Sequence, residues 1–215
     1  MKLEEMTVET EIVNLGATIM KTKTPKHILD RLLVEAKQKL ESYNQNLAGH
    51  LDNQLAFDKE TMMWFYNEML PIWNAYRQIH CNFHDLEHKP IDFSSSSLWV
   101  NHMKAGEFNP LHTHHGDLTF VVYLDVPKEI EEEQKNYVGK SAPPGCIEFM
   151  LAFQDFTNKP WATLGKHLTP RTGDLFVFPA KLQHTVPPFK SDVTRISVSG
   201  NLDIANRSEL GETYF

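Results

Sequence analysis

Three histidines and an aspartate fall within six residues of the chain, and a strongly β-forming run follows them directly. The histidines are His112, His114 and His115, and the aspartate is Asp117. Imidazole and carboxylate groups that share one face and leave positions open are the ligand set of non-haem Fe(II). Two ligands separated by one residue suit the end of a strand, because residues i and i+2 point the same way. The spacing predicts a metal site that still lacks one ligand.

The missing ligand has its best candidate far downstream, at His184. Arg195 follows eleven residues later. An arginine can hold both oxygens of one carboxylate through its planar fork of N–H groups. We therefore expect a metal held in part by His112 and His184, beside a site where Arg195 binds a dicarboxylic acid.

This order of residues resembles that of the Fe(II)/2-oxoglutarate-dependent dioxygenases. The resemblance is strongest to their prolyl-4-hydroxylase-like branch and to a group of mostly uncharacterised oxygenases common in tailed bacteriophage genomes. It covers roughly residues 95–203. Its motifs are a glycine six residues before the first ligand (Gly106 before His112), a strand ending in an aromatic residue (120–123), and a Gly-Asp-apolar-apolar-Phe-Pro strand (173–179).

The resemblance implies that His112 and His184 bind iron and that Arg195 binds the distal carboxylate of 2-oxoglutarate. Relatives carry an acid two residues after the first histidine, where this chain has His114. Asp117, three residues further on, would supply the carboxylate charge that offsets Fe(II). We favour His114 as the second ligand because it occupies the family position, and Asp117 stays open as the alternative.

Further residues surround this site in the same interpretation. Tyr123 and Ser197 are expected to assist Arg195 in binding 2-oxoglutarate, and Trp99, Asn101 and Met103 to shape the pocket. The cofactors implied are Fe(II), 2-oxoglutarate and O2, with ascorbate as a reductant. The expected reaction hydroxylates a C–H bond of a peptidyl, amino-acid or small-molecule substrate and releases succinate and CO2.

Two other functions fit some of the same residues. A cupin-type metalloenzyme with three histidine ligands would use His112, His114 and His184 without 2-oxoglutarate. A jelly-roll binding module without catalysis would need none of them. Arg195 separates the first alternative from the dioxygenase, because an enzyme without the co-substrate does not need that arginine.

Composition limits the remaining possibilities. The chain has 215 residues, 41% of them hydrophobic and 23% charged, which suits one globular domain. Its net charge of −7 argues against general nucleic-acid binding. Two cysteines form no disulfide framework, and the N-terminus lacks the apolar segment of a signal peptide. We expect a cytoplasmic enzyme (in the host cytoplasm if a phage encodes it) that does not engage membranes; its oligomeric state stays open.

The pattern of the chain predicts a mainly β protein with α additions. Its core would be a double-stranded β-helix, or jelly roll, with N-terminal helices packed on one sheet. We expect a single domain, residues 1–215, with a strand and supporting helices in 1–93, the catalytic jelly roll in 94–205 and a tail in 206–215. The expected elements are a strand at 6–14, a helix from Pro25 to about residue 47, a helix from Asp58 that Pro71 kinks or splits, a polar turn or edge at 94–97, and a charged loop at 127–144.

Overall fold

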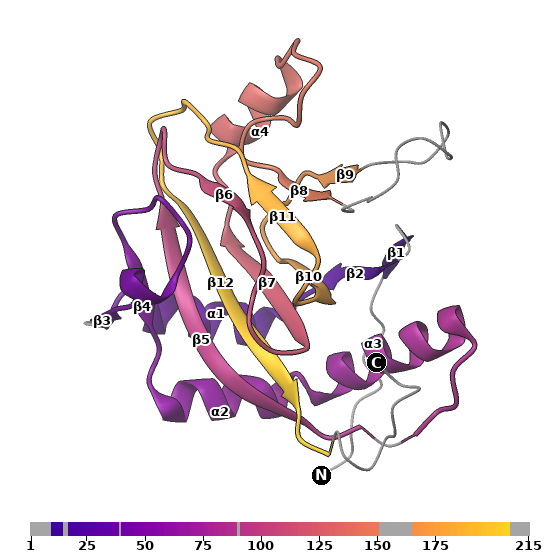
Figure 1. The fold of residues 1–215 in the computed structure, drawn as a ribbon. Helices are drawn as coiled ribbons and strands as arrows, with labels where there is room; N and C mark the ends of the chain where they lie inside the picture. The colour runs from indigo at the N-terminus through magenta and orange to yellow at the C-terminus, as the bar shows by residue number, and fades with distance from the viewer. Residues whose placement is uncertain (1–9, 15–16, 39, 90, 151–164, 207–215) are drawn as a thin grey trace.

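The chain folds into two antiparallel β-sheets that face each other, with helices on the outer side of the larger sheet (Figure 1). The computed structural model describes residues 10–14, 17–38, 40–89, 91–150 and 165–206. The larger sheet has eight strands in the order β1-β2-β10-β7-β12-β5-β4-β3, and the smaller has four in the order β6-β11-β8-β9. This is the jelly roll that the sequence predicts.

The elements have the following bounds. The larger sheet contains β1 (Glu11–Asn14), β2 (Thr18–Lys23), β3 (Glu41–Ser42), β4 (Gln54–Ala56), β5 (Phe93–Met103), β7 (Leu118–Asp125), β10 (Asp174–Pro179) and β12 (Arg195–Ile204). The smaller contains β6 (Asn109–His112), β8 (Ile147–Met150), β9 (Gly165–Leu168) and β11 (Gln183–Val186). The helices are α1 (Lys26–Glu35), α2 (Lys59–Glu68), α3 (Leu70–His84) and α4 (Lys128–Lys135), with a short 3-10 turn at Asn44–Asn46.

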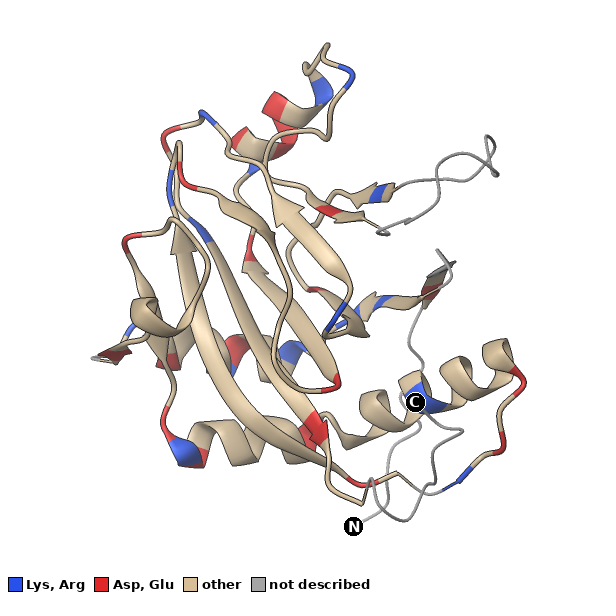
Figure 2. Cartoon of the chain, in the orientation of Figure 1, with Lys and Arg blue, Asp and Glu red and all other residues tan. Residues whose placement is uncertain are grey.

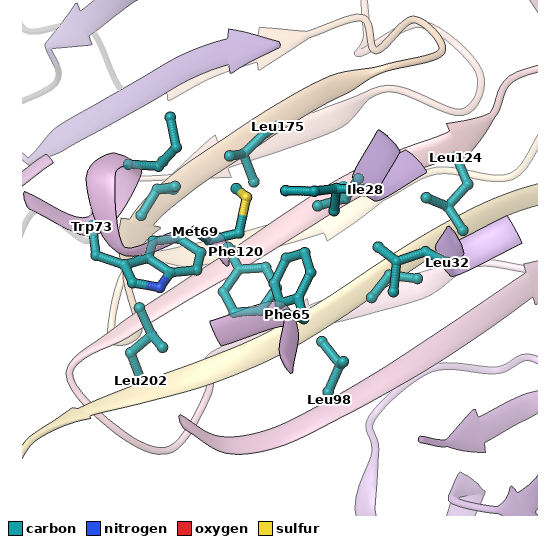
Figure 3. Packing of buried hydrophobic residues seen from close by; sticks show 14 of the residues in the cluster. Ile28, Leu32, Phe65, Met69, Trp73, Leu98, Phe120, Leu124, Leu175 and Leu202 are labelled. Atoms are coloured by element: carbon teal, nitrogen blue, oxygen red, sulfur yellow. The ribbon is translucent and has the colours of Figure 1, made fainter. Parts of the chain in front are cut away.

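The helices α1, α2 and α3 bury one face of the larger sheet. The side chain of Asp58 caps α2 by accepting a hydrogen bond from Thr61 N at 2.8 Å, and Pro71 stands in the first turn of α3, where a missing N–H is tolerated. The predicted start at Asp58 and the split at Pro71 are both confirmed. Figure 3 shows Phe65 and Trp73 against Phe120 of β7, with ring centroids 5.3 Å and 5.1 Å from Phe120. This core fixes the sheet that carries the site.

Alternation along β12 separates two environments. Val198 and Leu202 point into the core beneath the helices. Arg195, Ser197 and Ser199 point the other way, toward the smaller sheet, because successive side chains of a strand face opposite sides. The chemistry of the protein can therefore lie between the sheets while the helices supply stability on the far side.

The first helix is shorter than the sequence predicts. The pattern indicated a helix to about residue 47, but α1 ends at Glu35. Residues 41–42 instead form β3, which pairs with Leu55 and Ala56 of β4. Pairing with a distant segment has overridden the local helical periodicity here. The helix also begins one residue later than predicted, at Lys26, and no side chain caps its first turn.

Three further segments differ from expectation. The strand predicted at 6–14 appears as β1, Glu11–Asn14, with residues 6–9 outside the described part, and β2 was not predicted. The polar tract 94–97 lies inside β5, where it pairs with the end of β12. The predicted charged loop at 127–144 begins with α4, whose Ile130 is buried and whose first turn holds Glu129 and Glu131. Acidic residues at a helix N-terminus are favourable.

The N-terminal segment is built into the same sheet as the jelly roll. β2 pairs with β10 and β4 pairs with β5, and β5 begins at Phe93, beside the predicted boundary at residue 94. That boundary stays a prediction. Most residues of the described strands are uncharged, and the charged residues lie mainly on helices and connections (Figure 2). Among the described helices, none has the length and apolar character needed to cross a membrane.

Candidate active site

Strands β6 and β11 bring two of the predicted ligands together. His112 and His184 are register partners in this antiparallel pair, with ring centroids 4.3 Å apart. Nδ1–H of His112 donates to the carbonyl of Pro110 at 2.7 Å, and Nδ1–H of His184 donates to the carbonyl of Leu182 at 2.9 Å. These bonds fix the tautomer of both rings, so each Nε2 keeps its lone pair for a ligand.

His114 completes the cluster. Its Nε2 lies 3.2 Å from Nε2 of His184, and its backbone N–H donates to the carbonyl of Ala180 at 2.8 Å, which fastens the segment after β6 to the turn before β11. One ligand atom from each of His112, His114 and His184 lies within 4.8 Å of the others. Three imidazoles thus converge from two segments 70 residues apart.

The three imidazoles are held neutral. Burial, together with the proximity of the other histidines, lowers the pKa of His114 and of His184 to about 3. Burial also lowers the pKa of His112. Neutral imidazole is the form that binds metal. The cluster is therefore ready to bind a cation at neutral pH without first losing bound protons to solvent.

Asp117 lies at a different place. Its Oδ2 accepts a hydrogen bond from the backbone N–H of Ile204 at 2.7 Å, and its backbone N–H donates to the carbonyl of Leu202 at 2.9 Å. The turn before it needs Gly116, which has φ +82° and whose Cβ, if present, would lie 2.9 Å from the same carbonyl. Asp117 thus ties the start of β7 to the end of β12 and stands outside the histidine cluster.

Arg195 is buried beside the cluster without a carboxylate partner among the described residues. Its side chain is 3% exposed. Nη1 donates to the carbonyl of Gly145 at 2.6 Å and Nη2 to Sδ of Met103 at 2.9 Å, while Nε has no hydrogen-bond partner. The guanidinium lies 5.4 Å from the centre of the Tyr123 ring. Burial lowers the pKa of Arg195, as expected for a cation that lacks a counter-ion.

One cavity of about 470 Å³ between the sheets contains the site. Every site residue that the sequence singled out lines it, apart from Asp117: these are His112, His114, Tyr123, His184, Arg195 and Ser197. Trp99 and Asn101 also line the cavity, as expected. Met103, which was expected to do the same, is not among the lining residues and contacts Arg195 through its sulfur atom. Burial raises the pKa of Tyr123 to about 12, so its hydroxyl stays protonated.

Sequence reasoning missed several residues of the cavity. The carbonyl of Gly145 orients Arg195, and Tyr43 and Gln54 form part of the wall. No local pattern marks them, since Gln54 reaches the site only through the pairing of β4 with β5. A carbonyl group can come from any residue type, so the contact with Gly145 has no sequence signal at all.

The arrangement fits a divalent cation and a dicarboxylic acid side by side. Nε2 of His184 is unprotonated, because Nδ1 carries the proton of that ring. The hydrogen bond between the two Nε2 atoms is therefore donated by His114. A cation bound by both nitrogens would replace that proton. The unpaired Nε of Arg195 and its unbalanced charge suit a ligand carboxylate in the same cavity. The rings of Phe178 and Phe149 pack near that of His184, with centroids 4.9 Å and 6.1 Å away.

Comparison with solved structures shows the same fold in prolyl hydroxylases and in an α-ketoglutarate-dependent epimerase. A prolyl-4-hydroxylase from Pseudomonas putida aligns with a TM-score of 0.53 at 17% identity, over 87% of this chain and 93% of that one. The viral collagen prolyl hydroxylase of Paramecium Bursaria Chlorella virus-1 gives 0.52 at 15%, over 86% and 94%. SnoN, an α-ketoglutarate-dependent epimerase from nogalamycin biosynthesis, gives 0.56 at 18%, over 87% and 78%.

A family model carries the assignment beyond the fold. No curated protein matches the chain, but residues 97–201 match the family described as "Putative 2OG-Fe(II) oxygenase". That segment contains all three clustered histidines and Arg195. The matched segment is 105 of the 215 residues, and together with the shared fold it identifies the protein as a non-haem oxygenase, similar to the 2OG-Fe(II) oxygenases, that uses Fe(II), 2-oxoglutarate and O2.

Proposed function

We propose that His112, His114 and His184 hold the iron. Their convergence within one cavity supports this, as does the neutral state of all three rings. In this proposal Asp117 has a structural role, supported by its hydrogen bond to Ile204 N. The iron would then be bound by three neutral ligands instead of two and a carboxylate, and the charge of the site would be balanced by the co-substrate.

Arg195 binds the distal carboxylate of 2-oxoglutarate, with Tyr123 and Ser197 beside it. The observation that carries this role is the buried, unpaired guanidinium in the wall of the same cavity as the histidines. A buried charge is strongly destabilising unless it is paired, so a dianionic co-substrate supplies what the described residues lack. Ser197 is the register partner of Tyr123, and both line the cavity together with Arg195.

The reaction is hydroxylation of a C–H bond of the prime substrate. When bound, iron supplies O2 activation coupled to oxidative decarboxylation of 2-oxoglutarate, with succinate and CO2 as co-products. The protein's own part is to orient the co-substrate through Arg195 and to exclude water with apolar side chains such as Phe178 and Val186. Ascorbate serves as the reductant that restores Fe(II) after uncoupled turnover.

The prime substrate is a peptidyl or amino-acid side chain or a small molecule. Neighbours of the same fold include prolyl hydroxylases and an epimerase of nogalamycin biosynthesis, so the fold supports both kinds. The two cysteines, Cys81 and Cys146, are buried and form no disulfide with each other, which agrees with a reducing cytoplasm as the place of action.

An anaerobic Fe(II) titration tests the ligand set. His114→Ala should weaken iron binding at least about tenfold, because a three-residue site has no spare ligand. Asp117→Asn, which keeps the size of the side chain, should bind iron as the wild type does while unfolding more easily. The opposite pattern would transfer the ligand role to Asp117.

Addition of 2-oxoglutarate to the same samples tests the co-substrate. The chelate of Fe(II) with 2-oxoglutarate should show a weak visible charge-transfer band in the wild type. If iron binds but 2-oxoglutarate leaves the spectrum unchanged, the roles given to Arg195, Tyr123 and Ser197 are wrong.

A further inference from the structure

Two buried carboxamide groups in the cavity wall have oxygens without a hydrogen-bond partner. Gln54 of β4 is 2% exposed and Asn201 of β12 is 9% exposed. Among the described residues, neither Oε1 of Gln54 nor Oδ1 of Asn201 meets a donor. Both residues line the cavity that holds the histidines. Buried polar atoms are nearly always paired, so unpaired ones in a cavity point to a ligand that carries the missing donors.

A hydrogen-bonded chain fixes the orientation of Gln54. Its Nε2 donates to Oδ1 of Asn101 at 2.8 Å, and Nδ2 of Asn101 donates to Oγ of Ser199 at 3.3 Å. Gly49 packs closely on the other side, since a Cβ there would lie 3.0 Å from Nε2 of Gln54. With its nitrogen engaged and its position confined, Gln54 presents its oxygen as an acceptor.

Strand register places Gln54 and Asn201 on either side of the cross-strand row that lies beside His114. Gln54 shares a cross-strand row with Asn101 and Ser197. Trp99 and Ser199 form the next row, and the Trp99 ring lies 5.8 Å from that of His114. Asn201 stands one row beyond.

The distance between the two positions follows from strand geometry. Four residues along β12 and two strand spacings across the sheet separate Gln54 from Asn201, so their Cα atoms lie on the order of 15 Å apart. Their side chains shorten the gap. A ligand that reaches both oxygens therefore crosses the row beside His114, where the oxidised carbon must lie.

The rest of the wall is uncharged. Among the described residues that line the cavity there is no Asp, Glu or Lys, and Arg195 is the one Lys or Arg. Arg195 is assigned to 2-oxoglutarate. A charged group on the other ligand would thus meet no counter-ion there, and its desolvation would oppose binding.

We propose that Gln54 and Asn201 bind the prime substrate, and that this substrate is uncharged and offers a hydrogen-bond donor on either side of the carbon that is oxidised. The inference rests on the proposed function, because it takes the position of iron and 2-oxoglutarate from the histidines and Arg195. Asn101 acts as a positioning residue, since it touches Gln54 and holds its carboxamide in place.

The test uses the full chain loaded with 2-oxoglutarate and Zn(II), a diamagnetic substitute for iron. Adipamide, an uncharged six-carbon diamide, is titrated and followed by NMR shifts of the side-chain amides. Three compounds of equal length are compared with it: tetramethyladipamide has no N–H, 1,6-hexanediol has O–H donors, and 1,6-hexanediamine is cationic. Adipamide should bind about tenfold more tightly than tetramethyladipamide, since each hydrogen bond contributes roughly threefold to tenfold. Whether adipamide or hexanediol binds better tells whether the donor is N–H or O–H.

Variants assign the effect to the two residues. Gln54→Leu and Asn201→Leu should each weaken adipamide about threefold to tenfold and leave 2-oxoglutarate binding intact. Asn82→Leu, on the exposed face of α3, is the matched control and should change nothing. Gln54→Glu keeps the shape of the side chain and should shift the preference toward hexanediamine, which keeps the test informative if the leucine variant unfolds.

The outcomes separate this inference from the function on which it rests. Equal binding of adipamide and tetramethyladipamide, preference of the wild type for the diamine, unchanged affinity in both leucine variants, or no binding of any neutral probe would each overturn the role of Gln54 and Asn201. Absence of 2-oxoglutarate binding in the wild type would instead overturn the proposed function.

Discussion

Replacing Arg195 by methionine should have opposite effects on stability and on co-substrate binding. Arg195 is 3% exposed and has no carboxylate partner among the described residues. Methionine keeps an unbranched side chain of similar reach and removes the charge. The change therefore removes a buried, unpaired cation from the folded protein. It also removes the side chain that we propose binds the distal carboxylate of 2-oxoglutarate.

The magnitudes follow from the contacts of Arg195. Replacing buried charges by apolar side chains of similar volume is neutral or stabilising by about 1–4 kcal/mol. The carbonyl of Gly145 loses its donor, which costs roughly 1 kcal/mol in return. We expect the free energy of unfolding without 2-oxoglutarate to stay the same or to rise. A charge-assisted bidentate pair contributes at least about 1.5–3 kcal/mol, so the affinity for 2-oxoglutarate should fall about tenfold to a hundredfold or more.

Thermal unfolding with and without 2-oxoglutarate measures both effects. At 100 times its Kd, the co-substrate stabilises the wild type by about 2.7 kcal/mol, a rise in Tm of roughly 5–10 °C for a chain of this size. Arg195→Met should lose this rise, and Arg195→Lys should keep part of it because a point charge replaces the fork. Lys181→Met is the control: this exposed lysine donates to the carbonyl of His114 at 3.1 Å, and its loss should preserve the rise.

Two results would refute the reasoning. If Arg195→Met binds 2-oxoglutarate within about threefold of the wild type, a range below one charge-assisted hydrogen bond, Arg195 does not anchor the co-substrate. If the variant without 2-oxoglutarate unfolds far below the wild type, Arg195 mainly supports the structure through Gly145 and Met103.

Two further predictions concern stability. Gly200→Ala should lower the free energy of unfolding by about 2 kcal/mol or more, because the added Cβ would meet Phe120 Cζ and the carbonyl of Ser97, both at 2.5 Å; urea unfolding checks this, and wild-type stability would contradict the packing described. Chelator-treated protein should lose stability as the pH falls from about 6.5 toward 3, since burial lowers the pKa of His114 and His184 to about 3 and the unfolded chain, with its ordinary histidine pKa of about 6.5, binds more protons in that range. The loss is at most about 1.4 kcal/mol per pH unit for each histidine; a stability that stays flat from pH 7 to pH 5 would show that these rings are not held neutral.

Local signals in the sequence determined the class of fold and most of its elements. Asp58 and Pro71 mark helix boundaries through a cap and a missing N–H, and these operate within a few residues. The alternation of Arg195, Ser197 and Ser199 with apolar residues indicates a strand with one face in a core and one toward a cavity. Signals of this kind depend only on neighbours along the chain, so they can be read without a structure.

Part of the candidate site could also be predicted from local signals in the sequence. Spacing and residue type singled out His112, His184 and Arg195, which the structure brings to one cavity. The sequence favoured His114 over Asp117 but left Asp117 open, because both lie in the short segment between β6 and β7. In the structure the backbone N–H of His114 donates to the carbonyl of Ala180 and its ring lies in the cluster, while Asp117 meets Ile204, 87 residues further along the chain.

Only the tertiary structure decided what pairs with what across long distances. The helical pattern after Pro25 ends at Glu35 because residues 41–42 find a partner in β4. The same strand carries Gln54 to the cavity by pairing with β5. Such pairings depend on hydrogen bonds between segments far apart in sequence, and no periodicity within either segment specifies them.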